Sequence, residues 1–249
     1  MTYCCGILVN DGLVMVADTR TNAGLDNIST FRKLNTYHHP GERVLTLAAS
    51  GNLSISQSVV SLLNDGIAHA GADEPETLMT VPTMFRAAQL VGRAVRRIRD
   101  IEAATLEGSG VPFDVAFLFG GQIKGDRMGM FMIYPAGNFI ECTVDTPYLQ
   151  VGEHKYGKPI LDRAAHYGID LYDALKIALL SMDSTLRSNL GVGMPLDIVA
   201  VRRDVCDPEL VYRIEPNDAY FRDLSDRWSA ALREAHTAIP RPPYVTVGP

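Results

Sequence analysis

The stretch that decides the fold is MTYCCGILVNDGLVMVAD, residues 1–18. Its two apolar runs, 3–9 and 13–18, are separated by Asn10-Asp11-Gly12, residue types that tolerate the left-handed conformations of a tight turn. We therefore predict a buried β-hairpin at the start of the chain, with a three-residue loop and Gly12 in the left-handed region.

The length of this loop fixes which side chains share a face of the hairpin. With three loop residues, Val9 faces Leu13, and Asp18 lies opposite Cys4. Asp18 then shares a face with Thr2. A two-residue loop would shift the register by one and turn Asp18 to the opposite face.

The rest of the chain alternates between strand and helix patterns. Apolar runs bounded by Gly and Pro predict strands over 31–39, 42–51, 114–121, 127–137, 138–144, 196–204 and 209–216. Apolar residues at helical spacing predict helices over 52–70, 83–107, 155–168, 171–189 and 218–236. We expect the first four strands to form one sheet and the strands over 114–144 to belong to a second.

The order of these elements predicts an α+β fold of two antiparallel sheets stacked face to face, with helix pairs outside, an αββα arrangement. No linker is long or low in complexity, so we expect a single domain over 1–249.

Composition excludes several classes of function. The chain has 249 residues and a net charge of −6, which argues against binding nucleic acid or an anionic membrane by bulk electrostatics. Its four cysteines form no CxxC pair, and no signal sequence or membrane span is evident, so we expect reduced thiols and a cytoplasmic protein. His38 and His39 have no third ligand at metal spacing, and no GxSxG, HExxH or phosphate-binding loop occurs. We expect no metal and no cofactor.

Thr2 is the sharpest candidate for catalysis. If Met1 is removed, the α-amino group of Thr2, with a reference pKa of about 7.7–8.0, can take the proton of its own hydroxyl. A cation should then stand between Thr2 and the Asp18 carboxylate. We select Lys33 over Arg32, because an ammonium reaches a hydroxyl as a compact point charge. Gly51, where a strand meets a helix, offers a backbone N–H for an oxyanion.

These residues, in this order, resemble the start of a proteasome-type β subunit: Thr2, Asp18 in MVADTRTNAG, Lys33, and AASGN leading into a helix. Met1 directly ahead of Thr2 is similar to the bacterial HslV type. The whole chain, with DNISTFRKL, SMDSTLRSNLGVGMPLDI and a C-terminal extension, most closely resembles Anbu, the bacterial ancestral β-subunit group. The resemblance covers a core over about 2–215, leaving a helix and Pro-rich tail over 216–249.

The resemblance implies an N-terminal-nucleophile hydrolase that cleaves peptide or related acyl bonds through an acyl-enzyme. It implies Thr2 as nucleophile and base, Lys33 lowering the pKa of Thr2, Asp18 orienting Lys33, and the Gly51 N–H in the oxyanion hole. An aspartate followed shortly by a serine corresponds to Asp183 with Ser184 or Ser188. Glu153 or His154 stands where proteasome subunits carry a serine near the nucleophile.

The same resemblance implies a peptide or protein substrate and a homo-oligomer, either a ring or an open ring-like spiral. It does not identify an ATP-dependent unfoldase partner. Two rival functions stay open: a non-catalytic assembly subunit of the same fold, and an N-terminal-nucleophile amidase for small molecules. Taken singly, Thr2, Asp18 and Lys33 also fit ordinary structural roles.

Overall fold

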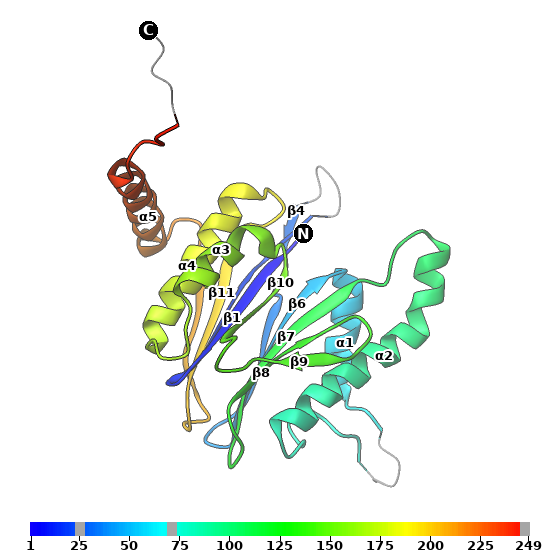
Figure 1. Cartoon of the computed structure of the whole chain (residues 1–249). Helices are drawn as coiled ribbons and strands as arrows, with labels where there is room; N and C mark the ends of the chain where they lie inside the picture. The colour runs from blue at the N-terminus through cyan, green and yellow to red at the C-terminus, as the bar shows by residue number, and fades with distance from the viewer. Residues whose placement is uncertain (23–27, 69–73, 245–249) are drawn as a thin grey trace. The chain divides into compact units, whose positions relative to one another are not determined.

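The computed structural model describes residues 1–22, 28–68 and 74–244. Chain contacts divide it into two units, Met1–Pro216 and Asn217–Pro249. The first unit carries two five-stranded antiparallel sheets and four helices in four layers (Figure 1). The predicted α+β class and αββα arrangement are confirmed.

The first sheet has the order β10-β1-β2-β11-β12. Its strands are Tyr148–Gly152 (β10), Tyr3–Val9 (β1), Gly12–Asp18 (β2), Leu196–Arg202 (β11) and Pro208–Ile214 (β12). All seven residues of β1 and of β2 are buried, because both faces of this pair are covered. A strand that is covered on both faces needs apolar residues at successive positions, as in YCCGILV.

The second sheet has the order β5-β6-β7-β8-β9. Its strands are Leu34–His39 (β5), Arg43–Gly51 (β6), Val115–Ile123 (β7), Gly129–Ile133 (β8) and Phe139–Glu141 (β9). A small two-stranded sheet, Arg20–Asn22 (β3) with Ile28–Thr30 (β4), lies between the first two hairpins along the chain.

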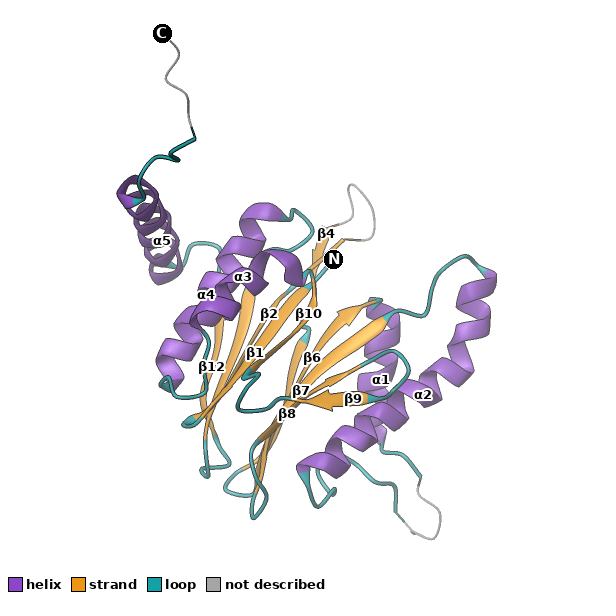
Figure 2. Ribbon diagram, viewed as in Figure 1, coloured by secondary structure: helices purple, strands orange, loops and turns teal. Residues whose placement is uncertain are grey.

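The prediction that the first four strands share a sheet was wrong. β1 and β2 lie in the first sheet, whereas β5 and β6 lie in the second (Figure 2). Each hairpin has an apolar face, and the two faces bury each other in one core. Met15, Leu13 and Cys4 of the first sheet belong to the same buried cluster as Val44, Ala48 and Leu118 of the second.

Helices cover the outer faces of the sheets. Leu53–Asp65 (α1) and Met84–Gly108 (α2) pack with the second sheet, and His154–Ala164 (α3) and Leu171–Ser188 (α4) pack with the first (Figure 2). The side chains of Asn52, Thr83 and Asp170 accept backbone N–H bonds and so cap α1, α2 and α4. The four predicted helices in this unit are therefore present.

The first hairpin is present, but its predicted loop was wrong. Val9 pairs with Gly12 and Cys4 with Ala17, so the turn has two residues, Asn10 and Asp11. Gly12 belongs to β2 and is not among the positive-φ glycines. Gly12 is required for its small size, because a Cβ on this residue would overlap the carbonyl oxygen of Val201 on β11.

The second unit contains one helix among its described residues, Ala219–Ala238 (α5), which the side chain of Asp218 caps. Of the helices that the structure describes, none is long and apolar enough to cross a membrane. The single-domain organisation predicted over 1–249 stays a prediction.

Candidate active site

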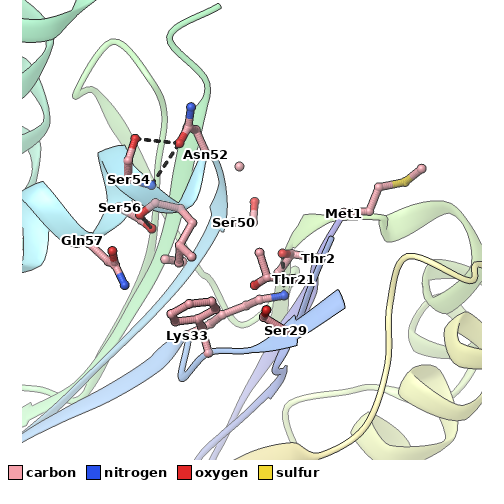
Figure 3. A pocket seen from close by; sticks show the side chains of 14 residues that line it. Met1, Thr2, Thr21, Ser29, Lys33, Ser50, Asn52, Ser54, Ser56 and Gln57 are labelled. Atoms are coloured by element: carbon pink, nitrogen blue, oxygen red, sulfur yellow. Dashed lines mark hydrogen bonds between the residues drawn. The ribbon is translucent and has the colours of Figure 1, made fainter. Parts of the chain in front are cut away.

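Lys33 joins Thr2 and Asp18 in one buried cluster. Its Nζ donates to Thr2 Oγ1 at 2.7 Å, to Asp18 Oδ1 at 2.9 Å and to the carbonyl of Arg20 at 2.5 Å. Thr2 is 7% exposed, Lys33 5% and Asp18 0%. Figure 3 shows the Lys33 nitrogen directed at Thr2. The ammonium has three N–H donors, and all three are used.

This meeting of Asp18 with Lys33 corrects the sequence argument that it needed a three-residue loop. Asp18 is the last residue of β2, and its carboxylate accepts the backbone N–H of Tyr3 at 3.1 Å and that of Gly193 at 3.2 Å. The carboxylate therefore lies at the end of the β1–β2 pair. At the end of a strand, the alternation of side chains between the two faces of the sheet no longer decides what the carboxylate contacts. The long Lys33 side chain therefore bridges Asp18 to Thr2.

The charges of this cluster are held in a low-dielectric setting. Burial raises the pKa of Asp18, while the neighbouring Lys33 ammonium and the two backbone N–H groups lower it in part. The ion pair is almost fully buried, with Asp18 0% and Lys33 5% exposed, so screening by salt is weak. An ammonium in this position stabilises negative charge that develops on Thr2 Oγ1.

Two glycines shape the backbone beside Thr2. Gly51 ends β6 with φ +98°, and a Cβ there would stand 2.5 Å from the Asp114 carbonyl. Gly152 ends β10 with φ +83°, and a Cβ there would overlap the carbonyl oxygen of Thr2. The next residue, Glu153, donates its backbone N–H to that same oxygen at 2.7 Å. Both glycines are therefore required by conformation and by space.

Sequence reasoning missed Gly152 and the strand that it ends. β10 is five residues long, pairs only with β1, and lies at the edge of its sheet. The signal that could have found it is YLQVG, a short alternating stretch between Pro147 and a glycine.

Asp183 and Ser188 are both on α4. Asp183 is buried on α4 and accepts from Arg187 Nε at 3.3 Å. Ser188 is the exposed last residue of α4. Among the described residues, neither lines the two cavities that open at Thr2. The structure thus brings together Thr2, Asp18, Lys33 and Gly51, and leaves the roles of Asp183 and Ser188 as predictions.

The two cavities at Thr2 have different linings. The α1 cavity, about 580 Å³, is lined by Met1, Thr2, Thr21, Ser29, Phe31, Lys33, Ala49, Ser50, Gly51, Asn52, Leu53, Ser54, Ser56 and Gln57. The β10 cavity, about 850 Å³, is lined by residues that include Asp114, Tyr148, Glu153, His154 and Lys158. Both volumes are ordinary for ligand sites.

Met1 lines both of these cavities. Its side chain is 66% exposed, and Asn189 Nδ2 contacts its sulfur at 3.3 Å. While Met1 is attached, the nitrogen of Thr2 is a peptide nitrogen and is not basic.

Within the described part of the chain, no group of three or more His, Cys, Asp or Glu side chains is placed to hold a metal ion. The four cysteines are free and buried.

No protein-family model matches the sequence, and no curated protein is similar to it. Solved structures are similar over nearly the full length. An Anbu (Gly-1) mutant from Hyphomicrobium sp. strain MC1 is 52% identical with a TM-score of 0.89, covering 97% of this chain and 99% of that one. Anbu (ancestral beta-subunit) from Yersinia bercovieri is 44% identical over 100% of both chains, with a TM-score of 0.88.

A third structure, the helical assembly of the Anbu complex from Pseudomonas aeruginosa, is 46% identical with a TM-score of 0.89, covering 98% of this chain and 99% of that one. Identity at this level over whole chains shows the family as well as the fold. The chain belongs to the Anbu family of ancestral β subunits, whose fold is that of the proteasome-like N-terminal-nucleophile hydrolases.

Proposed function

We propose that this protein is a threonine-type hydrolase that cleaves peptide or related acyl bonds after Met1 has been removed. One observation carries the proposal: a buried ammonium, Lys33, donates to Thr2 Oγ1 at 2.7 Å and is held by Asp18 at 2.9 Å. A structural ion pair does not need an open cavity beside it. A nucleophile, by contrast, needs both a neighbouring positive charge and a route by which the substrate reaches it.

The reaction begins with the new α-amino group of Thr2, which removes the hydroxyl proton as Oγ1 attacks the acyl carbon. The Lys33 ammonium, whose three donors bind Thr2 Oγ1, Asp18 Oδ1 and the Arg20 carbonyl, stabilises the developing charge on Oγ1. The Gly51 N–H, at the end of β6 and two residues before α1, is the donor that we propose for the oxyanion.

Collapse of the tetrahedral intermediate breaks the bond to the leaving amine, which receives the proton held by the α-amino group, and an ester on Oγ1 remains. Water then attacks the ester with the α-amino group again as base. The acid product leaves, and the proton returns to Oγ1.

We extend the proposal to assembly and location. The relative from Pseudomonas aeruginosa forms a helical assembly. For the present chain we propose a homo-oligomer, ring-shaped or an open ring-like spiral, that acts on peptide or protein substrates in the cytoplasm.

One observation favours a second function, that of a non-catalytic assembly subunit. Met1 contacts Asn189 and lines both cavities, and Glu153 or His154 stands where the resemblance to proteasome subunits implies a serine. If Met1 is retained, the fold and its assembly are all that the chain provides.

Intact mass and covalent labelling separate the two functions. The first function predicts loss of the Met1 mass and one adduct per chain with a peptide epoxyketone, located at Thr2 and absent from Thr2→Ala. Thr2→Ser, which keeps both the hydroxyl and the amine, should still react. A chain that retains Met1, or that labels equally with and without Thr2, refutes the hydrolase.

A further inference from the structure

The α1 cavity is lined mainly by hydrogen-bonding groups without charge. Besides Thr2, seven of the residues that line it carry a hydroxyl or an amide: Thr21, Ser29, Ser50, Asn52, Ser54, Ser56 and Gln57. Figure 3 shows Ser54, Ser56 and Gln57 of α1 on one side and Thr2, Thr21 and Lys33 on the other. A substrate that reaches Thr2 through this cavity therefore passes between two polar walls.

Lys33 is the one charged side chain among the described residues that line this cavity, and its charge is already committed. Its three N–H groups bind Thr2 Oγ1, Asp18 Oδ1 and the Arg20 carbonyl. It has no donor left for a carboxylate of a substrate. A charged substrate side chain would therefore lose hydration here without gaining a free counter-charge.

Thr21 lines the cavity, and its hydroxyl has unused hydrogen-bonding capacity. Its Oγ1 is shielded from solvent and has no hydrogen-bond partner among the described residues. A buried hydroxyl without a partner costs about 1–3 kcal/mol, so a small movement of this wall that lets a polar ligand group reach the oxygen is favoured.

The opposite wall has free hydrogen-bonding capacity as well. The amide of Gln57 makes no side-chain hydrogen bond within the described residues, and Asn52 uses only its Oδ1, to cap α1 at Ser54. An amide both donates and accepts, so it can pair with a substrate amide or hydroxyl. Ser56, by contrast, donates to Leu53.

The β10 cavity on the other side of Thr2 differs in kind, since Asp114, Glu153, His154 and Lys158 line it. Lys158 is paired with Asp162 and Glu153 lies 3.9 Å from Lys155, so among the described residues Asp114 is the carboxylate of this lining without an ion pair. The two sides of the cleft are thus chemically unequal.

We propose that the α1 cavity selects an uncharged, hydrogen-bonding substrate side chain, such as that of glutamine, and that Gln57 is the residue that determines this preference. The proposal rests on the threonine-hydrolase function and adds the substrate class to it. A site built to hydrogen-bond its substrate discriminates strongly against analogues that lack the bonding group.

The test uses the full chain after intact mass has shown that Met1 is gone. Four peptide epoxyketones, identical except for Gln, Leu, Glu or Lys next to the electrophile, are compared by their rate of labelling. The Gln probe is expected to react about tenfold faster than the Leu probe, and the Glu and Lys probes more slowly still. A Leu, Glu or Lys probe that reacts as fast as the Gln probe overturns the proposal.

Two variants locate the preference. Gln57→Glu should shift the ratio of Lys to Gln labelling by about tenfold toward Lys, because it places a carboxylate in the wall. Asn64→Asp adds the same charge on the exposed face of α1, outside the cavity, and should leave all ratios unchanged. An unchanged ranking in Gln57→Glu overturns the role of Gln57.

Calorimetric binding of the matching peptides to Thr2→Ala separates this proposal from the hydrolase itself. Tighter binding of the Gln peptide, with no labelling of the wild-type chain by any probe, refutes the hydrolase and retains the cavity preference. Labelling at Thr2 without a preference for Gln in either assay supports the hydrolase and refutes the cavity preference.

Discussion

Gly152 lies directly against Thr2. A Cβ at Gly152 would overlap the carbonyl oxygen of Thr2, and the following N–H, from Glu153, donates to that oxygen at 2.7 Å. The end of β10 therefore sets the position of the backbone that carries the proposed nucleophile. No side chain is involved, so the effect depends on the absence of a Cβ.

Gly152→Ala should therefore slow Thr2 labelling by about 100-fold, because it displaces Thr2 from Lys33. The positive φ of Gly152 adds about 1 kcal/mol of strain. Labelling kinetics and urea unfolding of the same preparation are the measurements. Gly41→Ala is the matched control, because Gly41 also has a positive φ but has open space around its Cβ position. Equal loss of labelling in both variants would contradict a positioning role for Gly152.

Lys33→Met should destabilise the fold by about 3–5 kcal/mol, because it leaves Asp18 buried without its ammonium. Burial raises the pKa of Asp18 in the folded state, so below that pKa the carboxyl is neutral and the loss is small. As pH rises past about 4, the unfolded chain releases this proton more readily than the folded one, and stability falls.

Urea unfolding at pH 5 and pH 8 measures this dependence. The variant should lose more stability relative to wild type at pH 8. Lys33→Met combined with Asp18→Asn should recover most of the loss, because both charges are then removed. A loss that is the same at both pH values, or that the double variant does not relieve, would rule out the buried-charge explanation.

Cys5 should lower stability in alkaline solution. Burial raises the pKa of its thiol to about 12, from 9.0. Above pH 9 the unfolded chain ionises this thiol while the folded chain does not, so stability falls as pH rises toward 12. At pH 10 the loss due to Cys5 is on the order of 1 kcal/mol. Unfolding at pH 8 and pH 10, with Cys5→Ala as the comparison, measures it. An equally steep fall in Cys5→Ala would refute the assignment.

The contact between Leu13 on β2 and Gly120 on β7 spans the two sheets. A Cβ at Gly120 would stand 2.7 Å from Leu13 Cδ2. Gly120→Ala should therefore cost about 1–3 kcal/mol by overpacking and should also slow Thr2 labelling. Combining Gly120→Ala with Leu13→Ala removes the side chain that the new Cβ would meet. The double variant should recover the rate of labelling more fully than the free energy of unfolding, because the buried Leu13 side chain is lost. Labelling at the wild-type rate in Gly120→Ala would disprove the link.

Periodicity predicted most elements of this fold, because long helices and fully apolar strands carry strong local patterns. It did not predict which sheet each hairpin joins. Both β1–β2 and β5–β6 have an apolar face, and the sequence pattern alone does not say whether two such hairpins pair edge to edge or pack face to face, as they do here. The turn length failed for a related reason. Gly12 was assigned to the loop for its conformational freedom, whereas its actual constraint is the approach of Val201, which is distant in sequence.

The candidate site was predictable only in part. Thr2, Asp18, Lys33 and Gly51 could be selected from residue types and family resemblance, and they lie together. Gly152 acts through its backbone and through space that only the folded chain defines, so no side-chain chemistry pointed to it.

The division of the site between the two sheets has a consequence of its own. Thr2 precedes β1 of one sheet, while Lys33 precedes β5 and Gly51 ends β6 of the other. The 2.7 Å bond between Lys33 and Thr2 therefore exists only at one alignment of the sandwich. A slide of one sheet past the other would leave every strand intact and still separate the proposed nucleophile from its cation. The rate of Thr2 labelling is therefore expected to respond to inter-sheet packing more sensitively than the melting temperature does.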